Sequence, residues 1–233
     1  MKNWNLSNGY TIRQVLTGRS NSYLISTGKD ILLVDTGRKS RRTRLTLQLL
    51  HHSKEGADWL ILTHVHFDHC ENASYIQEKF QSKIITSRKS EELCRKGRTR
   101  IPSGTNKWLK MITDFINKLP VNISRYQAFS PDFTVKKEFS FPKTDFAIQL
   151  IATPGHSADS ISIIVNNEIA LVGDVLFGVF PNRVLPPFAD DKEELIKSWG
   201  KLLETGCHTF LPGHGKAIKR SLLEREYQKY LQQ

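Results

Sequence analysis

The stretch Leu62-Thr63-His64-Val65-His66-Phe67-Asp68-His69-Cys70 places four side chains that can bind metal ions within six positions. It overlaps a short apolar run at residues 58–63, Asp-Trp-Leu-Ile-Leu-Thr, whose composition and length predict a buried strand. Residues 71–80, beyond the stretch, have the pattern of a helix. We therefore expect the four side chains on a loop between a strand and a helix, where a rigid scaffold can aim them.

The spacing of these side chains predicts metal ligands in two pairs. His64 and His66 are two residues apart, so an extended chain directs both to the same side, where they can bind one cation. Asp68 and His69 follow as the chain turns into the helix, so they point elsewhere and could serve a second cation. Zinc takes imidazole nitrogen and carboxylate oxygen in a shell of about four ligands. Each cation therefore needs partners from other parts of the chain.

Three positions that follow a glycine are the candidates for these partners. They are His156 in Thr153-Pro154-Gly155-His156-Ser157, Asp174 in Leu171-Val172-Gly173-Asp174, and His214 in Leu211-Pro212-Gly213-His214-Gly215. Any one such residue is more often a simple turn residue. Seven candidate ligands together favour a two-metal site.

The order of these motifs resembles the metallo-β-lactamase-fold hydrolase superfamily. His-x-His-x-Asp-His is followed by a Gly-His, a Gly-Asp and a Pro-Gly-His-Gly, and Val34-Asp35-Thr36-Gly37 resembles an early strand-end motif of that family. The match runs from about residue 10 to about residue 216 and is closest to the glyoxalase II and lactonase-like branch. The resemblance implies an α+β fold, the four-layer αββα sandwich. It also implies that Asp35 helps to orient the metal-binding histidines, a role compatible with capping its own turn.

The resemblance further implies which side chain holds which cation. The two divalent cations would be zinc, with iron or manganese as alternatives. His64, His66 and His156 would hold the first, Asp68, His69 and His214 the second, and Asp174 would bridge both. The implied reaction is hydrolysis of a small ester, thioester, lactone or phosphodiester by a hydroxide that bridges the metals. Asp68 would be the catalytic residue that orients this water or passes a proton to the leaving group.

Individual branches of the family fit less well. The family's lactamases usually lack either the histidine at position 69 or the aspartate at position 174, and both are present. Glyoxalase II carries a helical domain after its last ligand, whereas about 19 residues follow His214 (233 minus 214). Homoserine-lactone lactonases have a tyrosine between the positions of Asp174 and His214, which is missing here. The long RNA-binding arm of ribonuclease Z is also missing.

The charge of the chain keeps a second class of function open. There are 34 Lys and Arg residues against 23 Asp and Glu, a net charge of +11, and the excess is concentrated at residues 38–44, 88–100 and 216–220. Basic patches attract anionic partners, although most charge runs are solvated faces. We expect a small anionic substrate. The alternatives are a nucleic-acid-processing phosphodiesterase and a sulfur dioxygenase related to glyoxalase II, with one iron at His64, His66 or His156, and Asp174.

Composition limits the broad class of the protein. The chain is 39% hydrophobic and 24% charged, as soluble globular proteins are, and no apolar run reaches the ~18 to 20 residues that span a bilayer. The start has no apolar signal region and the three cysteines fit reduced thiols, so we expect a cytoplasmic protein without a membrane partner. We interpret Cys70 as a small buried residue. Because the ligands run from residue 64 to residue 214, we expect a single domain over residues 1–233.

Other segments carry expectations about packing. Residues 43–52 are predicted to form a helix that packs Leu45, Leu47, Leu49 and Leu50 on a sheet. A helical insertion is expected at about residues 97–127, with the apolar stripe of its helix, residues 106–119, in the core beside the active-site mouth. Residues 133–141 are predicted to start the second sheet, and residues 166–168 to connect a hairpin. The aromatic segment 177–188 is expected to form one wall of the substrate cleft.

Overall fold

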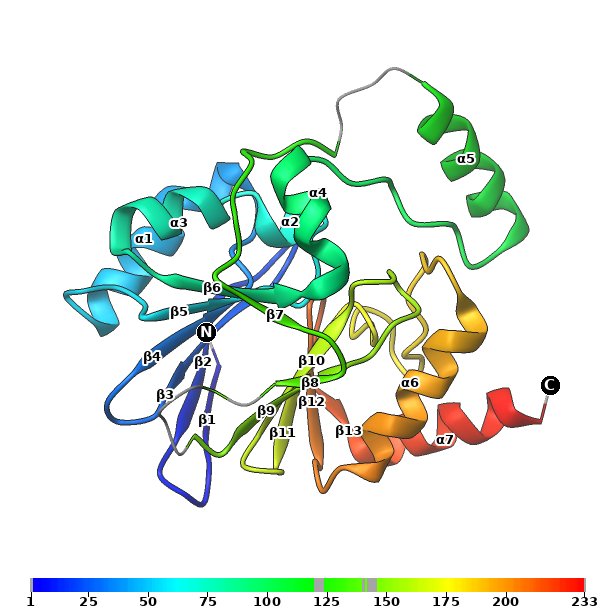
Figure 1. Ribbon diagram of the computed structural model, residues 1–233. Coiled ribbons are helices and arrows are strands. Elements are labelled where there is room, and N and C mark those ends of the chain that lie inside the picture. Colours follow the sequence, from blue (N-terminus) through cyan, green and yellow to red (C-terminus); the bar gives the residue numbers. More distant parts are fainter. Residues whose placement is uncertain (1, 120–123, 140, 142–145, 233) are drawn as a thin grey trace.

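Two mixed β-sheets form the centre of the computed structural model, which describes residues 2–119, 124–139, 141 and 146–232. The sheets lie face to face, and helices cover the outer face of each (Figure 1). The predicted α+β, four-layer αββα sandwich is therefore confirmed. The division into domains that the sequence suggested stays a prediction.

The first sheet follows the chain in order. Its strands are β1 (Asn3–Asn5), β2 (Thr11–Leu16), β3 (Ser22–Ser26), β4 (Ile31–Val34), β5 (Trp59–Ile61), β6 (Lys83–Ser87) and β7 (Phe133–Val135). The pairs from β1 to β4 are antiparallel, and the pairs from β4 to β7 are parallel. The parallel strands β4 and β5 end at the same edge, where Asp35 and the histidine-rich stretch follow them.

The second sheet is mainly antiparallel. Its order is β13 (Ile218–Lys219), β12 (Thr209–Pro212), β11 (Ile169–Gly173), β10 (Ile161–Val165), β9 (Ile148–Ala152) and β8 (Glu138–Phe139). The predicted hairpin joins β10 to β11, with Asn166 and Asn167 at positive φ as a tight hairpin turn requires. The strands β11 and β12 are parallel, so Asp174 and His214 follow them at one edge.

Side chains alternate between the inner and outer faces of both sheets. In β5, Trp59 and Ile61 join the core between the sheets, whereas Leu60 packs on the helix side. In β11, Leu171 faces the inner core and Val172 faces the outer helices. Because apolar clusters cover both faces, both strands read as continuous apolar runs.

The helices that cover the sheets bury only one face each. On the first sheet lie α1 (Arg42–His52), α2 (Phe67–Cys70), α3 (Ala73–Phe80) and α4 (Glu91–Lys96), and on the second lie α6 (Lys192–Glu204) and α7 (Arg220–Leu231) (Figure 1). In α1, Leu45 and Leu49 are buried as predicted. Leu47 and Leu50 are 62% and 42% exposed, so the prediction that they pack on the sheet is wrong. They lie off the helix face that is in register with Leu45.

The insertion differs from its prediction in how it packs. The helix α5 (Lys107–Lys118) is within one residue of the predicted ends, but it projects from the body of the protein (Figure 1). Trp108, Ile112 and Phe115 are exposed, and Thr113 is the buried residue of the helix. The expectation that this apolar stripe packs in the core is wrong, because the opposite side of α5 is the one that packs, against the loop that precedes the helix, where Thr113 accepts a hydrogen bond from Gly104 N.

Residues 133–141 were predicted to begin the second sheet, and the structure divides them. The strand β7 pairs in parallel with β6 and closes the first sheet, while β8 pairs with β9 in the second. The short connection between β7 and β8 therefore crosses from one sheet to the other. Part of the predicted segment, residue 140, lies outside the described residues.

Within the described part of the chain, no helix is both long and apolar enough to cross a membrane. Cys70, Cys94 and Cys207 are all buried and unpaired. Burial raises the pKa of the Cys70 thiol well above its usual value. The interpretation of Cys70 as a small buried residue is confirmed, whereas the cytoplasmic location stays a prediction.

The two leucines of α1 give a test of this packing. We expect Leu45→Ala to lower the free energy of unfolding by ~2–5 kcal/mol, because it removes a fully buried side chain. Leu47→Ala, in the same helix, should change it by less than about 0.5 kcal/mol. Urea denaturation followed by circular dichroism measures both values. Equal losses of unfolding free energy in the two variants would contradict the finding that Leu45 is buried and Leu47 is exposed.

Candidate metal centre

The histidine-rich stretch leaves β5 as an extended loop and then enters α2. Its backbone is held from two sides, because Ile161 N donates to Thr63 O and Val65 N donates to the Asp159 carboxylate. Val65 is buried between His64 and His66, and the rings of these two histidines lie 4.6 Å apart, centroid to centroid. The two side chains therefore lie next to each other, as their spacing predicted.

The other candidate ligands come from the edge of the second sheet. His156 follows β9, Asp174 follows β11 and His214 follows β12. His214 Nε2 lies 3.3 Å from Asp174 Oδ2, and His156 Nε2 lies 3.8 Å from the same oxygen. The two sheets thus bring their strand ends to one place.

All seven predicted side chains meet in three overlapping groups. The groups are His64, His66 and His156; His64, His69 and Asp174; and Asp68, His69 and His214. Within each group the possible ligand atoms lie within 4.8 Å of one another. Histidines outside this cluster stay apart from it: His51 and His52 end α1, as the sequence indicated.

The donor atoms have the spacing that a divalent cation needs. Tetrahedral zinc with Zn–N bonds of ~2.0–2.1 Å sets neighbouring donor atoms about 3.3 Å apart. The distance from His69 Nε2 to His214 Nε2 is 3.3 Å, and that from His66 Nδ1 to His156 Nε2 is 3.0 Å. His64 Nε2 and Asp174 Oδ1 are buried without a hydrogen-bond partner. Such atoms are costly unless something binds them, so the residues fit a metal centre.

Hydrogen bonds behind the cluster fix the rings. Asp35 accepts from Thr63 N, Thr63 Oγ1 and His69 Nδ1 at 2.8, 2.8 and 2.9 Å. Because the Thr63 hydroxyl donates to Asp35, it can accept from His64 Nδ1, 3.0 Å away. His156 Nδ1 lies 2.9 Å from Phe188 O, to which it can donate. In the neutral form of each of these three histidines Nε2 is then the nitrogen free of a proton, and it faces the cluster, which is the arrangement that metal-binding histidines use.

The surroundings shift the pKa values of the clustered histidines in different directions. Burial lowers the pKa of His156 to about 4 and that of His64 well below its usual value. Burial opposes the charge of His214 as well, but the carboxylates of Asp174 and Asp68 outweigh it and raise the pKa of His214 to about 9. Burial pushes the pKa of Asp68 up, yet His69 and His214 hold it at about 2. Asp68 is thus a carboxylate throughout the neutral range.

Several residues that position the ligands were missed by the sequence analysis. Asn21 donates from Nδ2 to Pro212 O and Gly215 O, and its backbone N–H donates to Gly213 O, so it fastens the loop that carries His214. Asp159 holds the backbone between His64 and His66. These contacts join residues far apart in sequence. A polar residue directly before a strand and an aspartate three positions after His156 were the available signals.

Close packing at Gly213 explains why a glycine precedes His214. A Cβ added there would lie 2.3 Å from Asp174 Oδ1 and 2.6 Å from His69 Cε1. No side chain fits between these two groups without displacing one of them. The Pro-Gly-His-Gly motif is therefore a packing requirement of the cluster as well as a turn.

A cavity of about 280 Å³ opens onto the cluster. His66, Asp68, Asp174 and His214 form its polar end. Its walls include Arg100, Ile101 and Pro102 from the insertion and Phe177, Pro186, Pro187 and Phe188 from the opposite segment. The prediction that residues 177–188 line the cleft is confirmed, and the beginning of the insertion lies at its mouth as expected.

The role of Asp35 can be tested by replacing one of its oxygens. We expect Asp35→Asn to weaken metal affinity ~10–100-fold, because the amide cannot accept all three hydrogen bonds and leaves His69 and Thr63 less well oriented. Asp114→Asn, on the exposed α5, is the matched control and should bind metal as the wild type does. Competition with a chromogenic chelator measures both affinities. An unchanged affinity in Asp35→Asn would contradict the orienting role.

Comparison with known proteins agrees with this geometry. The chain is 25% identical over 218 residues to a beta-lactamase-like protein 2 homolog of Drosophila melanogaster, 26% over 202 residues to an atrochrysone carboxyl ACP thioesterase of Aspergillus fumigatus, and 27% over 202 residues to a probable metallo-hydrolase of Methanocaldococcus jannaschii. These alignments cover 89%, 86% and 84% of the chain, and 62%, 52% and 88% of the relatives. The chain thus spans little more than half the length of the first two.

Solved structures share the fold. An archaeal metallo-beta-lactamase superfamily protein from Sulfolobus tokodaii superposes with a TM-score of 0.65 at 16% identity, covering 94% of this chain and 86% of that one. A protein crystallised in a di-iron-bound form superposes with a TM-score of 0.64 at 21% identity, covering 91% and 97%. The family model described as "Metallo-beta-lactamase superfamily" matches residues 15–214, from β2 to the last of the clustered histidines. The chain belongs to the metallo-beta-lactamase superfamily.

Proposed function

We propose that this protein hydrolyses a small ester, thioester, lactone or phosphodiester with the help of two divalent cations. The observation that carries the proposal is the convergence of seven donor side chains at the polar end of one cavity, with His64 Nε2 and Asp174 Oδ1 buried and unsatisfied. We further propose that residues 1–233 act as one domain in the cytoplasm.

The proposed ligand sets follow the three groups in the cluster. His64, His66 and His156 would hold one cation, Asp68, His69 and His214 the other, and Asp174 both. Asp174 lies 3.3 to 3.8 Å from donor atoms of both sets, which supports a bridging role. Zinc, iron and manganese all accept imidazole and carboxylate ligands, so the donor set does not select among them.

Cations held here would lower the pKa of a coordinated water toward ~7 and polarise the group under attack. The chain's own residues contribute position and charge. Asp68 is the most suitable acid-base residue, because its side chain is 22% exposed, lines the cavity and places Oδ2 3.3 Å from His214 Nε2. As a carboxylate it accepts a hydrogen bond from the attacking water and orients it.

The cavity restricts the substrate. A volume of about 280 Å³ lies at the small end of ligand pockets, and the lining includes three phenylalanines and three prolines. Arg100 adds a positive charge at the wall, which suits a small substrate that carries a negative charge. The Aspergillus fumigatus relative is named a thioesterase, and this favours a thioester within the proposed classes.

Removal of Asp174 tests the bridging role. We expect Asp174→Ala to lose both cations and to reduce turnover by at least about a thousandfold, since the shared carboxylate is lost. Asp114→Ala on α5 should keep both. Metal analysis of protein purified without added metal, with a hydrolysis screen over esters, thioesters, lactones and bis-nitrophenyl phosphate, measures these outcomes.

The same metal analysis, together with a binding assay for RNA and DNA, separates the rival functions. A variant that stays active and fully metallated would contradict the bridging assignment. One iron per chain would favour the sulfur dioxygenase, and tight, salt-sensitive binding of RNA or DNA would favour the nucleic-acid-processing phosphodiesterase.

Chelation gives a prediction about stability. A cation at a thousandfold its dissociation constant stabilises the folded protein by about 4 kcal/mol, so we expect removal by a chelator to lower the melting temperature by on the order of 10 °C. Added zinc or manganese should restore it. Differential scanning calorimetry measures the shift. An unchanged melting temperature would mean that the cluster does not bind cations in the folded state.

A further inference from the structure

A second hollow of about 630 Å³ lies beside the metal centre and shares none of its lining residues. It lies between the loop after β2 and the short 3-10 helix that precedes α1, Lys39–Arg41. We call it the basic pocket. Its lining residues are Leu16, Thr17, Arg19, Ser20, Arg38, Lys39, Ser40, Arg41 and Glu71.

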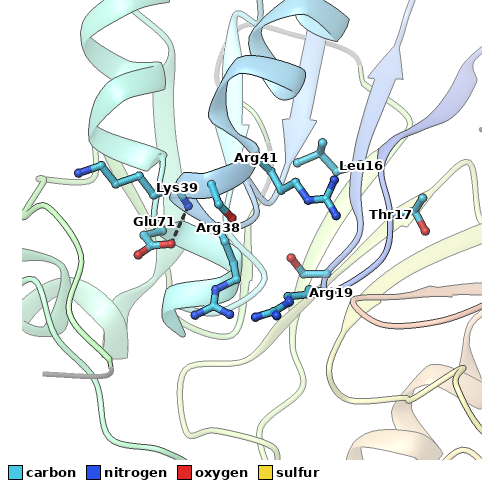
Figure 2. A pocket seen from close by; sticks show the side chains of 9 residues that line it. Leu16, Thr17, Arg19, Arg38, Lys39, Arg41 and Glu71 are labelled. Atoms are coloured by element: carbon cyan, nitrogen blue, oxygen red, sulfur yellow. Dashed lines mark hydrogen bonds between the residues drawn. The ribbon is translucent and has the colours of Figure 1, made fainter. Parts of the chain in front are cut away.

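Three arginines from two separate segments direct their side chains into the basic pocket (Figure 2). Arg19 belongs to the β2–β3 loop, and Arg38 and Arg41 belong to the segment directly before α1. A neighbour holds one of these guanidinium groups in place, because Arg38 stacks 4.7 Å from the centroid of the Phe67 ring.

The positive charge of the basic pocket is not balanced by the protein. Among the described residues, no carboxylate lies within ion-pairing distance of Arg19, Arg38 or Arg41. Glu71 is the acid that lines the pocket, and its Oε2 accepts from the backbone N–H of Lys39 at 2.6 Å. Four cationic side chains against one carboxylate give a formal lining charge of +3.

The start of α1 adds to this field. Neither the 3-10 helix nor α1 has an acidic residue in its first turn, and α1 has no capping side chain, whereas Glu71 accepts from the first N–H group of the 3-10 helix. The dipole of α1 favours an anion at this end. Like charges gathered in one hollow repel one another, and a bound anion would remove that repulsion.

Phosphate suits this pocket better than a lone carboxylate does. Several guanidinium groups from different directions can donate to the oxygens of a tetrahedral anion, whereas one carboxylate offers two oxygens in a plane. The volume leaves room for the molecule that carries the phosphate. We propose that the basic pocket binds a phosphate group of a small phosphorylated molecule.

Titration calorimetry of the metal-loaded protein with inorganic phosphate tests this proposal. Arg19→Gln, Arg38→Gln and Arg41→Gln should each weaken phosphate binding about tenfold or more, because each removes a charge-assisted hydrogen bond. Arg44→Gln, an equal loss of charge at an exposed site on α1, is the matched control and should stay within about twofold of wild type. Metal content should be the same in all four variants, which keeps this test separate from the proposed hydrolysis.

Two further probes decide what kind of ligand the basic pocket takes. Succinate at matched ionic strength should bind at least tenfold more weakly than phosphate, and a single-stranded oligonucleotide should not need the three arginines. Equal affinity for succinate, an equal effect of Arg44→Gln, or no phosphate binding at all would overturn the proposal. Oligonucleotide binding that requires the three arginines, without phosphate binding, would reassign the pocket to a nucleic-acid surface.

Discussion

The carboxylate of Asp35 is the contact on which the metal centre depends. It accepts both polar hydrogens of Thr63 and lies within hydrogen-bond distance of His69 Nδ1, so it joins the end of β4 to the end of β5 and orients His69 directly. Through the Thr63 hydroxyl it also positions His64. Asp35 has a φ of 57°, an unusual conformation that aspartate tolerates better than most residues. The hydrogen bonds that it gains there offset the strain of that conformation.

In the second sheet, too, the ends of strands place the donor side chains of the metal centre. Asp174 and His214 follow parallel neighbouring strands, and Gly213 lets the backbone of one approach the side chain of the other. Asn21, at the start of β3, then ties this loop to the first sheet through three hydrogen bonds. The centre is thus held by both sheets, and its donors sit on backbone that is fixed by strands rather than on free loops.

Much of this could be predicted from the sequence, since the ligands lie in short motifs at strand ends. The local spacing of His64 and His66 and the apolar runs of β5, β10 and β11 predicted elements that the structure has. Packing was less predictable. Leu47 and the apolar stripe of α5 read as core residues, because periodicity shows that a helix has an apolar face but not what covers it. Asn21 and Asp159 act across long sequence separations, and their local sequence signals do not show which distant residues they contact.

The basic pocket and the metal centre are built on opposite sides of the same short segment. Phe67 and Asp68 line the metal-side cavity, while the ring of Phe67 supports Arg38 and the backbone carbonyl of Asp68 accepts from Ser20 Oγ at 2.7 Å. Glu71, one turn further, holds the backbone at Lys39. A ligand bound to Arg38 would therefore lie against a side chain that packs on the segment carrying Asp68 and His69. Part of the +11 charge of the chain therefore lies beside the metal centre, where it can attract anions.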